Sequence, residues 1–132
     1  MFACVCDTVV APQPLLPPVS HTDAVAYFDR WLELSPRLNR AGLRALVIAA
    51  ELCPPLLGFR GRLRVLGRAE RARALDTLEA VRQPRVRELV RLVKGIATLC
   101  YYGDDDVMLR LGYDAEANLR RGRELRAAEG RP

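Results

Sequence analysis

The stretch that decides the fold class is PRVRELVRLVKGIATLC, residues 84–100. Its apolar side chains recur every three or four residues, which is the spacing of one face of an α-helix. Proline opens the stretch, at a position where a helix does not need its missing N–H. Arg87, Arg91 and Lys94 fall on the opposite face, which we expect to be solvated. The apolar positions are Val86, Leu89, Val90, Val93, Ile96, Ala97 and Cys100.

A second strongly apolar stretch lies at residues 38–53, before Pro54 and Pro55. It is apolar on nearly every side, so we expect it to be the central helix of the fold. Residues 56–67 contain three glycines and predict turns. We expect these turns to carry four apolar side chains back to the core, namely Phe59, Leu63, Val65 and Leu66.

Further helices are predicted at residues 2–10, 22–34, 68–82 and 104–111. Ser20 or Thr22 is expected to cap the second of these, and the run of aspartates at 104–106 to cap the last. The result is an all-α fold, a compact single-domain bundle of about five to six helices over residues 1–114. A proline-rich connector at 11–20 and a charged tail at 115–132 complete the prediction, and the tail can form a helix that packs loosely or not at all.

The net charge of +5 comes almost wholly from arginine, since Lys94 is the only lysine. One cluster of six arginines surrounds the glycine segment, and a second lies near the C-terminus. Such patches attract nucleic acid or an acidic protein surface. Acidic residues alternate with arginine along most of the chain, however, and no reading helix is recognisable, so we predict no nucleic-acid partner. The clusters are Arg60, Arg62, Arg64, Arg68, Arg71 and Arg73, and Arg120, Arg121, Arg123 and Arg126.

Side chains suited to catalysis are few. His21 is the only histidine and stands beside the proline-rich connector, and the two serines, Ser20 and Ser35, occupy expected capping positions. The sequence GFRG at residues 58–61 lacks the third glycine and the preceding strand of a dinucleotide-binding loop. The sequence therefore predicts a non-catalytic chain that binds no flavin itself.

The four cysteines, Cys4, Cys6, Cys53 and Cys100, are expected to be reduced and mostly buried. Cys4 and Cys6 lie two positions apart on a predicted helix, about 200° around its axis, so they point to opposite sides. This arrangement disfavours a zinc site, and we predict no metal. We also see no export signal and no apolar run long enough to span a membrane, so the expected location is the cytoplasm.

Two short motifs resemble a known family. LCYYGDDDVMLRLGYD, residues 99–114, resembles the tyrosine pair, acidic turn, short helix and LGY signature of the gluconate 2-dehydrogenase subunit 3 family. CDTVVAP, residues 6–12, resembles the opening helix and proline stop of the same family. Looser similarity spans residues 2–114. The residues carried over as a family element, structural or partner-binding, are Tyr101, Tyr102, Gly103, Asp104, Leu111, Gly112 and Tyr113.

The resemblance implies a small helical subunit that pairs with a flavoprotein catalytic subunit of the glucose-methanol-choline type, in which FAD is held by the partner. Many members carry a twin-arginine export signal. This chain departs from them there, so stabilisation of the partner is the expected role, and export with the partner is less well supported. A free-standing protein interaction module is the main alternative, and a DNA-binding regulator is the third.

Overall fold

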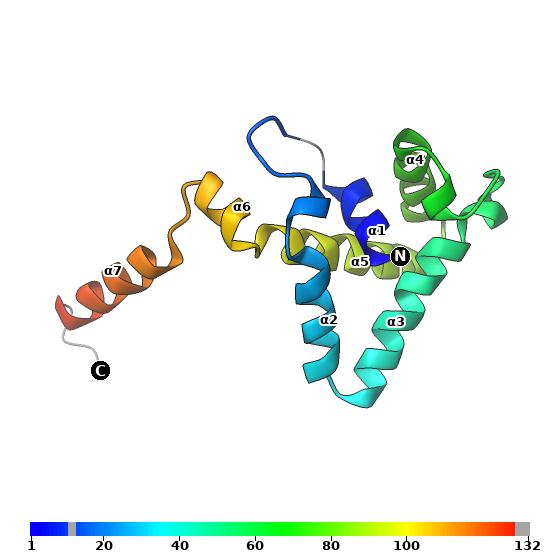
Figure 1. Ribbon diagram of the computed structural model, residues 1–132. Helices are drawn as coiled ribbons and strands as arrows, with labels where there is room; N and C mark the ends of the chain where they lie inside the picture. The colour runs from blue at the N-terminus through cyan, green and yellow to red at the C-terminus, as the bar shows by residue number, and fades with distance from the viewer. Residues whose placement is uncertain (11–12, 129–132) are drawn as a thin grey trace.

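The computed structural model describes residues 1–10 and 13–128 (Figure 1). Within these ranges the chain is all-α and contains no strand. Three short 3₁₀ helices connect the longer elements: η1 (Val19–His21), η2 (Pro54–Leu57) and η3 (Leu63–Val65). The α-helices are α1 (Phe2–Val9), α2 (Ala24–Leu34), α3 (Arg37–Leu52), α4 (Arg68–Glu79), α5 (Pro84–Tyr102), α6 (Asp105–Arg110) and α7 (Ala115–Ala128).

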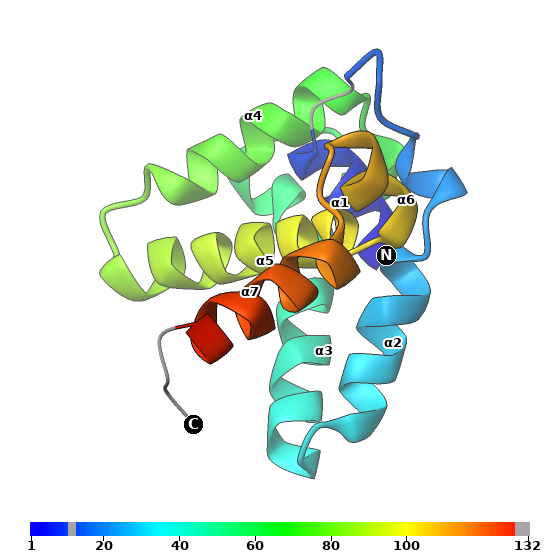
Figure 2. The same cartoon turned by 90° about the vertical axis from the view of Figure 1, so that its left-hand side faces the viewer.

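The central helix is α5, which contacts α1, α2, α3, α4 and α6. The prediction that residues 38–53 form the central helix is therefore wrong. In α3, which covers this segment, only Val47, Ala50 and Glu51 are buried. Helices α2 and α3 form a hairpin that leans out from α5, so one side of α3 has no cover (Figures 1 and 2). The buried side chains of α5 are Val90, Val93, Ile96, Ala97, Cys100 and Tyr101.

The main core lies where α1 and α2 pack against α5. The rings of Phe2 and Phe28 stack with centroids 3.8 Å apart, and the thiol of Cys6 points at the carbonyl oxygen of Ala97, 3.9 Å away. A smaller apolar cluster of Leu75, Leu78 and Val90 joins α4 to α5. The core thus consists of two parts that share α5.

The glycine segment only partly follows the prediction. Leu63 and Leu66 are buried and Phe59 packs partly against the core, whereas Val65 is 75% exposed, so its predicted burial is wrong. A 3₁₀ turn gives successive residues different directions. Leu63 therefore points inward, while the neighbouring Arg64 reaches Glu51 with 2.7 Å between Nε and Oε1.

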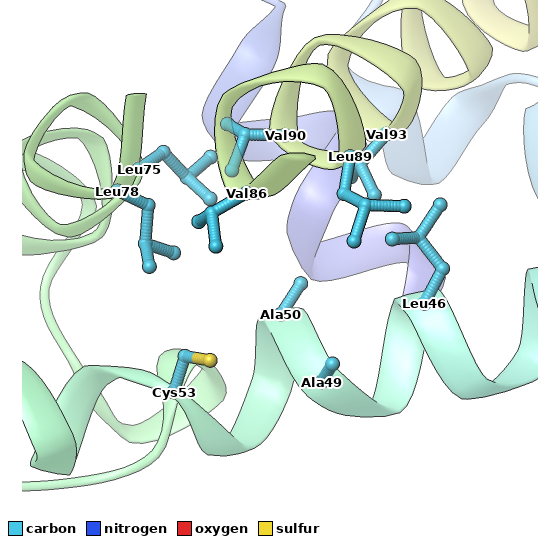
Figure 3. A pocket seen from close by; sticks show the side chains of 10 residues that line it. All are labelled: Leu46, Ala49, Ala50, Cys53, Leu75, Leu78, Val86, Leu89, Val90 and Val93. Carbon is cyan, nitrogen blue, oxygen red and sulfur yellow. The ribbon is translucent and has the colours of Figure 1, made fainter. Parts of the chain in front are cut away.

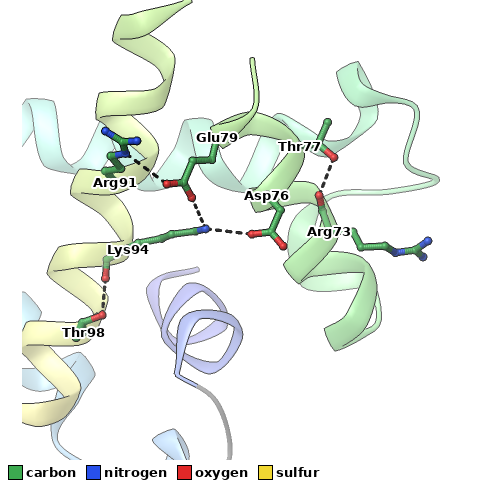
Figure 4. Close-up of polar contacts among 7 residues, drawn as sticks. All are labelled: Arg73, Asp76, Thr77, Glu79, Arg91, Lys94 and Thr98. Carbon is green, nitrogen blue, oxygen red and sulfur yellow. Dashed lines mark hydrogen bonds and ion pairs between the residues drawn. The ribbon is translucent and has the colours of Figure 1, made fainter. Parts of the chain in front are cut away.

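The predicted solvated face of α5 is wrong for Lys94. Its ammonium group lies between α5 and α4, 2.6 Å from Glu79 Oε2 and 3.1 Å from Asp76 Oδ1 (Figure 4). Arg91 remains exposed and places its Nε 3.4 Å from the same glutamate. Asp76 and Glu79 thus hold the side chain of Lys94 between α4 and α5.

The second helix begins without the predicted cap. Neither Ser20 nor Thr22 occupies the N-cap position of α2, which is Asp23. The hydroxyl of Thr22 donates to the carbonyl oxygen of Val19 at 2.9 Å instead. At the short sixth helix, by contrast, the aspartate cap is confirmed: Asp104 Oδ1 accepts the backbone N–H of Val107 at 3.2 Å.

Helix α7 corresponds to the predicted charged tail. It extends away from the other helices (Figure 1), and none of its described side chains is buried. The proline-rich connector is irregular from residue 13 to residue 18, and Ala11, Pro12 and residues 129–132 lie outside the described residues. Within the described part, no helix is long and apolar enough to cross a membrane.

Candidate functional site

The tyrosine pair of the predicted motif lies at the C-terminal end of α5. Tyr101 is 2% exposed, and its hydroxyl donates to the carbonyl oxygen of Pro17 at 2.6 Å. Burial raises the pKa of Tyr101, and the neighbouring Tyr102 and Asp104 raise this pKa further. The ring of Tyr102 meets that of Tyr101 edge-on, with centroids 5.1 Å apart. Tyr101 therefore holds the proline-rich connector against the end of α5.

Gly103 and Asp104 shape the turn that follows. The Gly103 N–H donates to the carbonyl oxygen of Leu99 at 2.9 Å, and a β-carbon at Gly103 would lie only 2.8 Å from that oxygen. Asp104 then uses its second carboxylate oxygen, Oδ2, to accept the backbone N–H of Asp23 at 2.8 Å. This half of the motif holds the connector, α2 and α6 in place.

The other half of the motif ends α6. Gly112 has a positive φ of 75°, a conformation that favours glycine. The N–H of Tyr113 reaches back to the carbonyl oxygen of Met108 at 2.9 Å, which is typical of a helix C-terminus. Leu111 and Tyr113 are 53% and 51% exposed. Of the seven motif residues, these two are therefore the large apolar side chains available to another protein.

A second surface was not predicted from the sequence. A groove of about 450 Å³ lies between the α2–α3 hairpin and α5, and we call it the hairpin groove. Four of its large apolar side chains are exposed: Trp31, Leu38, Leu89 and Leu92. Only Ser35 and Asn39 contribute polar side chains. Its lining is Trp31, Ser35, Leu38, Asn39, Gly42, Leu43, Leu46, Leu89, Leu92 and Ile96.

The hairpin groove follows from the excess of apolar residues in α3. Apolar side chains of α3 extend beyond the part of its circumference that α2 and α5 cover. Leu38 is consequently 84% exposed. The many apolar side chains at residues 38–53 were the signal for this surface, and they were interpreted as a central helix instead.

The structure brings His21 near the acidic turn and leaves Ser35 apart from them. His21 is exposed and lies beside a hollow that Asp104 and the next two aspartates share. Ser35 ends α2, where its hydroxyl donates to the carbonyl oxygen of Trp31 at 2.8 Å. No group of three or more histidine, cysteine, aspartate or glutamate side chains within the described residues is arranged to hold a metal ion.

Cysteine environments differ along α1. Cys4 is half-buried, with its sulfur 3.1 Å from Nη1 of Arg71, whereas Cys6 is buried on the other side of the helix. Burial, the nearby Cys100 and Asp7 raise the pKa of Cys6 to about 12. Burial also raises the pKa of Cys100 to about 11. The thiols of Cys6 and Cys100 therefore remain protonated and unreactive at neutral pH.

Half of the first arginine cluster is engaged in structural contacts. Arg64 pairs with Glu51, and Arg71 pairs with Asp7 at 2.5 Å. Arg68 donates to the carbonyl oxygen of Val10. Arg60, Arg62 and Arg73 are exposed and form no ion pair with the described residues. The basic patch is therefore smaller than its six arginines suggest.

Comparisons with known proteins found no match for this chain. Family models, curated proteins and solved structures were searched, and none matches it.

Proposed function

We propose that this chain is a non-catalytic small subunit that binds and stabilises a flavin-dependent catalytic subunit. The observation that carries the proposal is the exposed hairpin groove. Its leucines and tryptophan lie together in water, which is unfavourable for an isolated chain and favourable for one that is covered by a partner. Burying one such leucine contributes about 1.5–3 kcal/mol to association before the entropy of binding is subtracted.

The groove has the composition of an interface core. Trp31 is the kind of aromatic anchor that dominates binding energies, and Leu38, Leu89 and Leu92 line the same groove. Charged side chains are missing from this lining, as is usual at the centre of protein interfaces. The partner surface that fits is therefore apolar and convex.

The identity of the partner rests on the motif resemblance. It suggests a glucose-methanol-choline type dehydrogenase or oxidase that acts on alcohols or sugars and carries FAD in its own chain. In this proposal the small subunit takes no part in catalysis and stabilises its partner only by the surface that the two chains bury together. The same groove supports a second candidate, a free-standing interaction module whose partner is not a redox enzyme.

Co-expression tests the proposal. The chain is produced with a flavoprotein encoded beside its gene, and the soluble yield and bound FAD of that flavoprotein are measured. We expect the two chains to co-elute and the flavoprotein yield to rise. Leu92→Glu places a charge in the groove at a half-exposed position, so it should abolish both effects without unfolding the chain.

A matched control is Leu119→Glu, which places the same charge on α7 at a 60% exposed leucine away from the groove. It should leave co-elution intact. Circular dichroism checks that both variants remain helical. Dye reduction with an alcohol donor by the isolated chain would overturn the proposal. Native-host purification that yields a stoichiometric partner without flavin would favour the second candidate.

A further inference from the structure

An apolar cavity of about 150 Å³ lies between α3, α4 and α5 (Figure 3). Side chains from all three helices point into it, and Cys53 carries the only hydrogen-bonding group among them, a weak thiol. The residues that line it are Leu46, Ala49, Ala50, Cys53, Leu75, Leu78, Val86, Leu89, Val90 and Val93. We call this space the three-helix cavity.

Short side chains account for the empty space. Ala49 and Ala50 of α3 face Val86 and Val90 of α5 across the cavity (Figure 3). None of these four side chains is long enough to fill the gap between the two helices. Leu78 of α4 closes one side without reaching across. Larger residues at 49 and 50 would fill the space, and their absence leaves it open.

Water is a poor occupant of this space. A water molecule in this space finds no side-chain hydrogen-bond partner except the weak thiol of Cys53, so an apolar group gains by displacing it. Charged or strongly polar ligands are also excluded, because no lining side chain would compensate their lost hydration. The chemistry of the lining therefore selects an uncharged hydrocarbon group.

The cavity is accessible from the surface. Ala49 and Leu89 on its rim are exposed, so a ligand can enter without unfolding of the bundle. Leu46 and Leu89 also line the hairpin groove. A chain that enters the cavity can therefore continue along that groove, and a polar end group can remain in water.

We infer that the three-helix cavity is a binding site for the alkyl chain of a small uncharged molecule, such as a linear alcohol. The alkyl end occupies the cavity beside Ala50 and Cys53, and the hydroxyl end lies at the opening near Ala49. The inference goes beyond the proposed subunit role and does not depend on it.

Titration of the isolated protein with linear alcohols of four to eight carbons tests the site. Binding is followed by NMR shifts of the methyl groups of Ala50 and Val90. We expect saturable shifts, with affinity rising about fourfold for each added methylene group while the chain still finds apolar surface. Shifts that grow linearly with alcohol concentration and never saturate would overturn the inference.

Cavity-filling variants locate the binding. Ala50→Leu and Ala49→Leu should each weaken binding of the best alcohol at least tenfold, because the new side chain occupies the site. Ala45→Leu makes the same change on α3 at an exposed position that lines neither space, and it should leave the affinity unchanged. If Ala50→Leu does not fold, Ala49→Leu at the exposed rim decides. Equal affinity in all variants would exclude the cavity as the site.

Discussion

The carboxylate of Asp104 accepts the backbone N–H of Asp23, 81 residues earlier in the chain, with 2.8 Å between Oδ2 and N. Its other oxygen accepts the N–H of Val107 at the start of α6. One side chain thus satisfies donors at the N-termini of two helices, where negative charge is favoured. The acidic turn therefore fixes the N-termini of α2 and α6 at the end of α5.

Replacing this carboxylate should lower stability. Asp104→Ala removes both hydrogen bonds, so we expect the free energy of unfolding to fall by about 1–2 kcal/mol in urea titrations. Asp106→Ala is the control, because Asp106 is exposed and its side chain accepts no hydrogen bond from the described residues. Its effect should be within about 0.5 kcal/mol. Equal losses in the two variants would contradict the bridging role.

Two glycines of α5 and its end should respond in opposite ways to alanine. Gly103→Ala places a β-carbon 2.8 Å from the Leu99 carbonyl oxygen, and such a contact should destabilise the fold by about 1–3 kcal/mol. Gly95→Ala meets no atom within 4 Å inside a regular helix, so it should stabilise by about 0.5–1 kcal/mol. Thermal unfolding of both variants measures the difference, and a shared sign would refute the explanation.

The buried thiols should make stability fall at alkaline pH. Unfolded cysteine ionises near pH 8.5, at about its ordinary pKa, whereas the pKa of Cys6 is raised to about 12 and that of Cys100 to about 11. The folded state thus retains protons that the unfolded state loses. The contribution of the two thiols to the free energy of unfolding should be constant below about pH 8 and decline from pH 9 upward, as urea midpoints would report.

A double variant isolates this effect. Cys6→Ala with Cys100→Ala removes both thiols, so the alkaline decline should become shallower than in the parent protein. Midpoints between pH 8 and pH 10 are the informative range, since tyrosines ionise above it. An unchanged slope would mean that other groups control the decline.

The ion pairs of Lys94 with Glu79 and Asp76 should make stability fall as the pH is lowered, whereas the buried thiols make it fall as the pH is raised. Burial opposes the charge of Lys94, but hydrogen bonds to Glu79 and Asp76 prevail and raise its pKa. The hydrogen bond and charge of Lys94 lower the pKa of Glu79. The contribution of Glu79 is therefore present above its unfolded pKa of about 4.3 and is lost as pH falls below that value.

Lys94→Met tests this cluster. It should lower the urea midpoint at pH 7 and reduce the further drop between pH 5 and pH 3, and high salt should shrink both differences. Arg85→Met is the control, since Arg85 is exposed and forms no ion pair with the described residues. The interpretation fails if the two variants behave alike.

Several local features of this fold could be predicted from the sequence, although the cap expected at Ser20 or Thr22 was wrong. Proline and glycine stops, the period of residues 84–100 and the aspartate cap at Asp104 all depend on neighbours within a few positions. The identity of the central helix depends on which apolar faces meet in space. Helix α3 was wrongly predicted to be central, because it has more apolar residues than the bundle covers. Burial of Val65 failed for a related reason, since a single 3₁₀ turn decides its direction.

The candidate site divides in the same way. The motif at 101–113 was recognised in the sequence, but only the structure shows that Tyr101 is buried and Tyr113 is exposed. The hairpin groove and the three-helix cavity combine residues from α3 and α5, which are far apart in sequence. Neither space could be recognised before the packing of these helices was known.

The pairing of α1 with α5 also governs the order of events during synthesis. Cys6 meets its partner Ala97 only after 91 further residues have been added, which takes roughly 5 to 20 s at ordinary translation rates. Throughout that interval the nascent first helix can pack only against earlier elements such as α2 and α4, and the side that faces α5 has no cover. The main core is therefore completed late, because it closes only after the longest helix of the described chain has been made.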